Sequence, residues 1–174
     1  MKPIDNWQNV EAQGNEEYKR LTPGGYICRI TKVEDNPEKQ YLYIEFDIAE
    51  GEFTGYGASC LERNGFTPLR MYRSYTDKAA GMFKGFVQDV EQSNAPHYKW
   101  AWDEKSLIGR IVGVVLGEEE YKKQDGSIGT RFNARTKPVS AIRDGKFKVP
   151  AKKTIQVDTT PTFTPVEDDG QLPF

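Results

Sequence analysis

The chain has 174 residues, of which 37% are hydrophobic and 29% are charged. This length favours one domain with additional flexible segments. No run approaches the roughly 18 apolar residues of a membrane-spanning helix, and residues 1–7 lack the apolar stretch of a secretion signal. Two cysteines, Cys28 and Cys60, show no metal-site spacing. These features exclude a membrane protein and predict a cytoplasmic one.

The net charge of -2 is unevenly distributed along the chain. Residues 121–153 hold ten Lys and Arg against two acids, which gives +8. Residues 158–174 hold four acids and no Lys or Arg. A basic stretch followed by an acidic tail predicts a polyanionic ligand that the tail does not bind.

The first third of the chain reads as an arm followed by two strands. Residues 1–21 are polar with scattered apolar anchors, which indicates an N-terminal arm. Alternation over residues 26–31 predicts a strand, and residues 35–38 form a turn sequence. Residues 41–48 show the clearest period of two, which predicts a second strand with one apolar face.

The middle third predicts an irregular connection, a strand and a helix. Four glycines within residues 50–67 indicate a long irregular connection, and residues 69–74 alternate as a third strand. Apolar residues then recur at helical spacing from Ala79 to Val90, after a cap at Thr76 or Asp77.

The last third predicts a hairpin and a tail. A β-branched run at residues 111–116 and alternation over residues 130–135 predict two strands. The loop at 121–126 joins them and contains Asp-Gly, a favoured hairpin turn pair. Beyond Pro150 the chain is rich in Thr and Pro and low in aliphatic residues, so we expect it to be disordered.

Three strands, one helix and two strands in this order predict an all-β fold, a five-stranded oligonucleotide-binding (OB) barrel with its helix between strands three and four. A β-sandwich needs about seven strands and no central helix. The expected organisation is an arm at 1–21, the OB domain at 22–149 and a disordered tail at 150–174.

Aromatic and basic side chains gather on the predicted binding strands and on the loop between strands four and five. Rings stack on unpaired bases and cations follow the phosphates, so this mixture predicts binding of single-stranded nucleic acid. For Trp100 and Trp102 the alternative is packing at the barrel end. The candidate contacts are Tyr41, Tyr43, Arg70, Tyr72, Arg73, Trp100, Tyr121, Lys122, Lys123, Arg131 and Arg135.

Two other function classes stay open beside DNA binding. An OB module can act as an adaptor that binds protein and no DNA. Glu120-Tyr121-Lys122 matches half of a metal-dependent nuclease signature, with Asp47 as the only candidate for its upstream acid. With a lone histidine, His97, and no phosphate loop, we expect no enzyme activity, no metal and no cofactor.

The ending Asp168-Asp169-Gly170-Gln171-Leu172-Pro173-Phe174 resembles the acidic tip of bacterial single-stranded-DNA-binding proteins. In that family the tip docks enzymes of replication, repair and recombination, which the resemblance implies for this chain. An aromatic plug, a proline and acids suit docking on a basic pocket. The implied partner-binding residues are Asp168, Asp169, Leu172, Pro173 and Phe174.

Residues 25–30 and 41–53 are similar to a family in phages and conjugative elements of Gram-positive bacteria, whose members often sit among replication and recombination functions. Together the two resemblances imply a protein of a phage or mobile element that acts in the cytoplasm of a bacterial host. We expect it to bind single-stranded DNA without strong sequence preference and to recruit partners through its tip. Association with further copies of the chain stays open.

Overall fold

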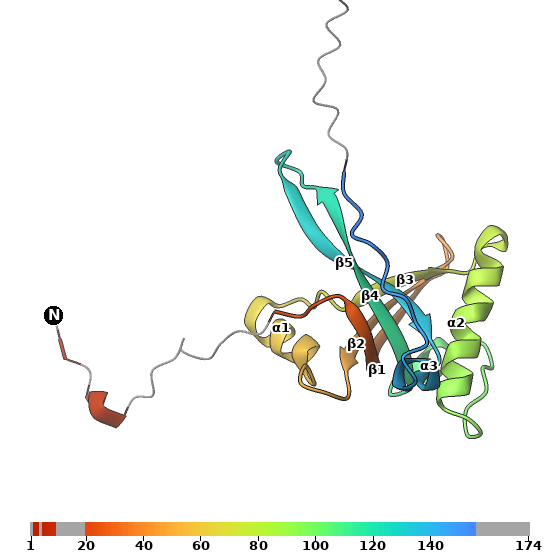
Figure 1. Ribbon diagram of the computed structural model, residues 1–174, viewed down its shortest axis with the longest axis horizontal. Helices are drawn as coiled ribbons and strands as arrows, with labels where there is room; N and C mark the ends of the chain where they lie inside the picture. The colour runs from red at the N-terminus through yellow and green to blue at the C-terminus, as the bar shows by residue number, and fades with distance from the viewer. Residues whose placement is uncertain (1, 4, 10–19, 156–174) are drawn as a thin grey trace, which may run out of the picture.

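The computed structural model describes residues 2–3, 5–9 and 20–155, and residues 20–155 form one antiparallel sheet with helices around it (Figure 1). The strand order is β3-β2-β1-β4-β5. The strands are β1 (Gly24–Asn36), β2 (Tyr41–Ile48), β3 (Arg70–Ser74), β4 (Ile111–Lys122) and β5 (Ile128–Lys137). The helices are α1 (Tyr56–Asn64), α2 (Ala80–Ser93) and α3 (Val139–Arg143), with 3-10 turns η1 (Trp7–Asn9), η2 (Asp77–Ala79) and η3 (Glu104–Leu107).

The five strands and the helix between the third and fourth strand confirm the expected mostly-β architecture. The sheet is strongly twisted, so its two edge strands, β3 and β5, approach each other. Within the described chain these two strands do not pair through a backbone ladder. The hairpin of β4 and β5 projects beyond the rest of the sheet (Figure 1).

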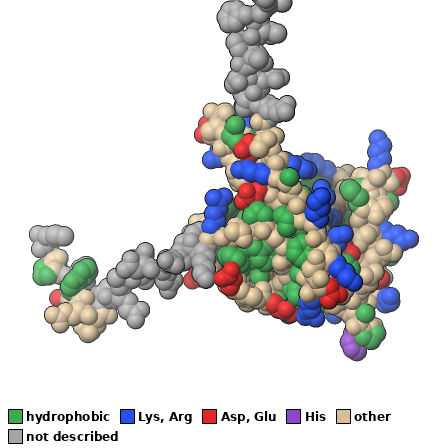
Figure 2. All heavy atoms as spheres, in the orientation of Figure 1, with side chains coloured by type: hydrophobic (Ala, Val, Ile, Leu, Met, Phe, Trp, Pro, Cys, Tyr) green, Lys and Arg blue, Asp and Glu red, His purple; other side chains and the backbone are tan. Residues whose placement is uncertain are grey.

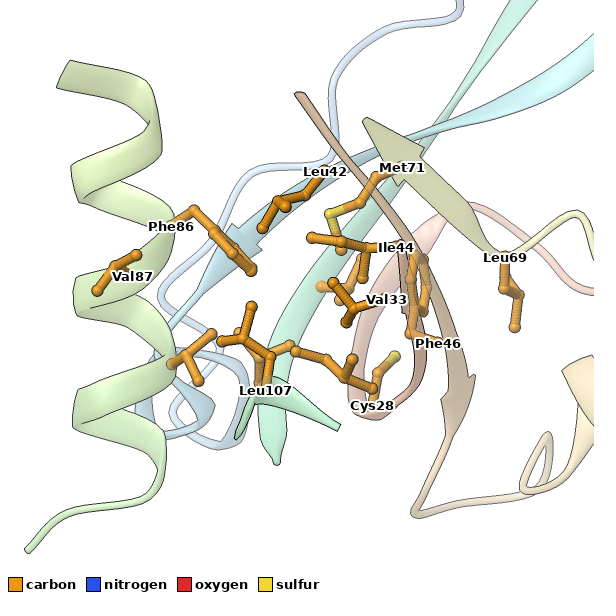
Figure 3. Close-up of a cluster of buried hydrophobic side chains, with 14 of the residues drawn as sticks. Cys28, Val33, Leu42, Ile44, Phe46, Leu69, Met71, Phe86, Val87 and Leu107 are labelled. Atoms are coloured by element: carbon orange, nitrogen blue, oxygen red, sulfur yellow. The ribbon is translucent and has the colours of Figure 1, made fainter. Parts of the chain in front are cut away.

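The core lies between the inner face of the sheet and α2 (Figure 3). Period-two alternation puts every second side chain of β2 inside, from Leu42 to Ile48. Helical spacing does the same for α2, whose buried side chains are Phe83, Phe86, Val87 and Val90. Met82 was expected on this apolar face but is 75% exposed, because it lies in the first turn of the helix at the edge of the buried stripe.

A β-bulge in β1 keeps apolar side chains on the core side both before and after it. The pairing with β2 shifts register between Ile30 and Lys32. The shift changes the phase of the alternation, so that Ile30 and Val33 both point inward although they are three residues apart.

The prediction of an irregular connection at 50–67 was wrong, because α1 occupies half of it. Gly55 and Gly65, which suggested a loop, bracket this helix with left-handed φ angles of 79° and 77°. The Asp47 carboxylate accepts hydrogen bonds from the amides of Gly57 and Ala58 at 2.7 and 3.1 Å. A side chain on β2 therefore satisfies the free N–H groups that begin the helix.

The ordered domain extends beyond the expected boundary at 149. A segment after α3 runs along β4, where Lys153 exchanges backbone hydrogen bonds with Glu118 and Glu120. Pairing with β4 holds residues 150–155, so they do not belong to the expected disordered tail. The expected arm is shorter as well, since Leu21 is 1% exposed in the core.

A small second core covers the outer face of β1 and β4. Gly25 has no room for a Cβ because the Phe147 ring lies against it, and Ile142 of α3 packs on Gly113 in the same way.

Within the described residues, no helix is both long and apolar enough to cross a membrane.

Candidate nucleic-acid interface

An open groove of about 580 Å³ lies between β3 and the projecting hairpin of β4 and β5. Arginines outnumber acids on its walls by four to two. The cations and rings that line it are Arg20, Arg70, Arg73, Arg131, Phe66, Tyr72, Tyr121 and Phe132. The groove thus combines positive charge with aromatic surface at the place where the two edge strands approach.

The alternation of β3 places its side chains on opposite sides. Met71 points into the core, whereas Arg70 and Tyr72 point outward. Tyr72 is 57% exposed, which is high for an aromatic ring on a strand. Phe66 precedes β3 and is also 57% exposed. Two rings are therefore available to solvent along one wall of the groove.

Three tyrosines form a continuous aromatic surface next to the groove. The Tyr72 ring lies 5.4 Å from that of Tyr41 and 5.2 Å from that of Tyr43, centroid to centroid. Both contacts are tilted or edge-on, so each ring supports its neighbour without covering it. The predicted grouping of Tyr41, Tyr43 and Tyr72 on one face of β2 and β3 is thus what the structure shows.

Charged groups surround the Tyr43 ring. Its hydroxyl donates a 2.7 Å hydrogen bond to Glu45, and the Lys32 ammonium lies 5.9 Å from its ring centroid. Burial and the hydrogen bond to Glu45 raise the pKa of Tyr43 above its ordinary value, while Arg70 opposes them. Tyr43 therefore stays a neutral phenol at physiological pH and adds no negative charge to this surface.

The opposite wall carries Tyr121 and Arg131 on the hairpin. The Arg131 guanidinium lies 5.2 Å from the Tyr121 ring centroid and pairs with Glu119 at 2.7 Å. Its side chain remains 61% exposed. Stacking and pairing hold the guanidinium in place while leaving part of it open to a ligand.

Arg73 differs from the other predicted cations because it points inward. Its guanidinium lies 5.8 Å from the Phe86 ring centroid and donates a 3.2 Å hydrogen bond to the carbonyl of Ala134. Burial lowers the pKa of Arg73, with the charge of Asp89 acting against this shift. Arg73 lies at the floor of the groove, where it links β3 to β5.

The remaining predicted contacts lie outside this groove. Lys122 and Lys123 are exposed at the hairpin tip, and Arg135 is exposed on β5. Trp100 packs on Phe83 with a centroid distance of 6.0 Å, which matches the alternative role at the end of the core. Arg20 and Phe66 also line the groove, although the sequence predicts an arm for the first and an irregular connection for the second.

Lys and Arg side chains gather around the base of the hairpin on the face shown in Figure 2, with hydrophobic side chains between them. The +8 stretch of residues 121–153 runs from the hairpin tip through β5 and α3 and back along β4 (Figure 1). Part of its positive charge, including Lys122, Lys123 and Arg131, therefore lies on the hairpin that forms one wall of the groove.

The acids of the nuclease alternative have other partners in the structure. Asp47 binds the first amides of α1. Glu120 accepts a hydrogen bond from the amide of Ile155 and lies 3.8 Å from Lys152. In the part of the chain that the structure describes, no group of three or more His, Cys, Asp or Glu residues could hold a metal ion.

The predicted partner-binding tip, residues 168–174, lies outside the described residues. Comparison with models of known protein families and with curated proteins finds no match for this chain. The fold and the groove are therefore the basis for the function proposed next.

Proposed function

We propose that this protein binds single-stranded DNA without strong sequence preference, in the groove between β3 and the β4–β5 hairpin. The strand order β3-β2-β1-β4-β5, with α2 between β3 and β4, supports assignment to the OB class. In that class the strand 2–3 face and the 1–2 and 4–5 loops bind nucleic acid. Here the tyrosines of β2 and β3 and the hairpin of β4 and β5 occupy those positions.

The observation that carries this proposal is the exposure of Tyr72 between arginines. Its ring is 57% exposed and lines the groove together with Arg70 and Arg131. Bases stacked on aromatic side chains contribute about 1–3 kcal/mol each, and every base has a ring face to offer. A duplex keeps its bases stacked inside, so this surface favours unpaired strands.

The cations of this surface are suited to pairing with the phosphates of a DNA strand. Arg70 and Arg131 line the groove, and Lys122 and Lys123 extend the positive surface to the hairpin tip. Each neutralised phosphate releases counterions, so the affinity falls as salt rises. The contacts are with backbone phosphates and ring faces, which accounts for the proposed lack of sequence preference.

We also propose that the acidic segment 168–174 recruits proteins of replication and recombination, as its likeness to known tips suggests. The last described residues run beside β4 at the hairpin. The last described residue, Ile155, therefore lies at the hairpin that forms one wall of the proposed DNA groove.

The test is a fluorescence titration of the full chain with oligo(dT), which has no tyrosine or tryptophan signal of its own. At low salt we expect saturable quenching of tyrosine emission, reversed by added salt. A chain that binds no oligo(dT) at low salt would contradict the proposal and favour the protein-binding adaptor. Loss of oligonucleotide length on adding magnesium would favour the nuclease.

A further inference from the structure

A second hollow, of about 170 Å³, lies where the end of β1 meets α2 and the loop that follows α2. It shares no lining residue with the groove described above. Two carboxylates and four aromatic rings dominate its walls, and neither Lys nor Arg lines it. These six side chains are Asp35, Tyr75, Phe83, Trp100, Trp102 and Glu104.

Trp102 has an unfavourable backbone conformation and a side chain that is mostly exposed. Its φ angle is 60°, in the left-handed region that side chains other than glycine rarely adopt. Its side chain is 79% exposed, although the ring lies 6.0 Å from that of Trp100. A strained backbone that displays a large apolar ring to solvent is typical of a binding position.

The loop around Trp102 is fixed on both sides. The amide of Trp100 donates a 2.9 Å hydrogen bond to Glu91 of α2. Asp103 accepts hydrogen bonds from the amide of Lys105 at 3.1 Å and, through its carbonyl, from the Ser106 hydroxyl at 2.6 Å. Hydrogen bonds on both sides of Trp102 thus hold the loop that presents its ring, which lowers the entropy lost on binding.

The charge of the hollow selects the ligand. Asp35 accepts a 2.7 Å hydrogen bond from the Tyr75 hydroxyl, which fixes its carboxylate, and Glu104 also lines the hollow. Two carboxylates repel phosphate and attract a cation. Aromatic faces bind cations as well, with tryptophan the strongest among them.

The indole Nε1–H of Trp100 supplies a further observation. This donor is buried and has no hydrogen-bond partner within the described chain. A buried donor without an acceptor costs about 1–3 kcal/mol. An arginine side chain offers an aliphatic stem for the ring faces and a cation for the carboxylates, whereas a simple metal ion offers no stem.

We propose that this hollow is a docking site for an arginine side chain of a partner protein. The guanidinium stacks on Trp102 and pairs with the carboxylates of Asp35 and Glu104, since its planar fork suits both contacts better than an ammonium does. The site is separate from the DNA groove, so it does not depend on the function proposed above.

The test follows the indole N–H signals of the full chain by NMR during titration with N-acetyl-L-argininamide. We expect saturable shifts for Trp100 and Trp102, with Trp7 as the unmoved internal reference. The uncharged analogue N-acetyl-L-citrullinamide should give no saturable shift. Glu104→Gln should weaken the response, whereas Glu38→Gln, in the exposed turn after β1, should leave it unchanged.

Several outcomes would overturn this proposal. They are the absence of a saturable shift, an equal response to the citrulline analogue, and an equal response to N-acetyl-L-lysinamide. Shifts of the same two signals by oligo(dT) would make nucleic acid the ligand instead. Self-association that Trp102→Ala abolishes would make a second copy of the chain the occupant.

A single substitution separates a binding role from a structural one. Trp102→Gly removes the ring and suits the left-handed φ angle, so the melting temperature should rise while the response to N-acetyl-L-argininamide disappears. A fall in melting temperature would show that the Trp102 ring stabilises the fold, and would overturn its assignment as a displayed binding group.

Discussion

The guanidinium of Arg73 on β3 donates a 3.2 Å hydrogen bond to the main-chain carbonyl of Ala134 on β5. This bond spans the two edge strands, which have no backbone ladder between them in the described chain. A side chain therefore links the strands where a closed barrel would use backbone pairing. The same link sets the floor of the proposed DNA groove.

Replacing Arg73 with methionine should destabilise the protein by about 1–3 kcal/mol, because it removes this hydrogen bond from a half-buried position. Methionine keeps much of the packing against Phe86. The free energy of unfolding in urea measures the change. The matched control is Arg70→Met on the exposed face of β3, which should change stability by at most about 0.5 kcal/mol. Equal effects of the two substitutions would contradict the linking role of Arg73.

Asp89 of α2 should make stability depend on pH. Burial raises its pKa above the ordinary value, while a 2.8 Å hydrogen bond from Thr136 acts the other way. The folded state thus holds this proton more tightly than the unfolded state, so stability is lost as pH rises through the folded-state pKa.

Asp89→Asn removes the free-energy cost of burying an ionised carboxylate. The variant should therefore be more stable than the original protein at neutral pH. The difference should shrink as pH falls toward about 4, where the unfolded carboxyl becomes protonated. Urea unfolding of both proteins across this range measures it. A difference that is constant, or that grows in acid, would contradict the assignment.

The strands and α2 could be predicted from sequence because their signals are local. Alternation in β2 and helical spacing in α2 each lie within one element. The missed α1 depends on a long-range contact, since Asp47 satisfies its first amides from ten residues away. Its glycines also suggested a loop. In the structure two of them bracket the helix, and the third, Gly57, packs against Asp47.

In the candidate site as well, local patterns could be predicted from the sequence and long-range contacts could not. The tyrosine group of β2 and β3 followed from alternation together with the expected strand pairing. Arg73 could not be placed, because the edge strands meet through twist, and an arginine near the end of β3 then reaches across to β5. Arg20 and Phe66 join the groove only through the path of the chain around the sheet.

Arg131→Gln should weaken DNA binding in a salt-dependent way. If Arg131 neutralises one phosphate of a single strand, the magnitude of the slope of log affinity against log salt should decrease by about 0.7. The control is Lys84→Gln on the exposed face of α2, which removes one positive charge away from the groove and should leave the slope unchanged. Oligo(dT) titrations at a series of salt concentrations measure both slopes. A uniform loss at every salt concentration would indicate that Arg131 acts through structure.

Deletion of Leu172, Pro173 and Phe174 should separate the two proposed activities. DNA affinity should hold or rise, because the deleted residues carry no cation. Recovery of replication and recombination proteins from a host extract should be lost. Replacing the three residues with Ser-Gly-Ser keeps the chain length and serves as a second variant. Unchanged recovery of these proteins by both variants would contradict the role of the tip.

The most direct test of DNA binding is oligo(dT) affinity at low salt for the original protein, Tyr72→Ala and Tyr72→Phe. Loss of one stacked base is worth about 1–3 kcal/mol, so Tyr72→Ala should bind about 5- to 150-fold more weakly. Tyr72→Phe keeps the ring and should bind like the original protein, as should Trp102→Ala, which lies outside the groove. Failure of the original protein to bind oligo(dT), or equal affinity of Tyr72→Ala and Tyr72→Phe, would contradict the proposed interface.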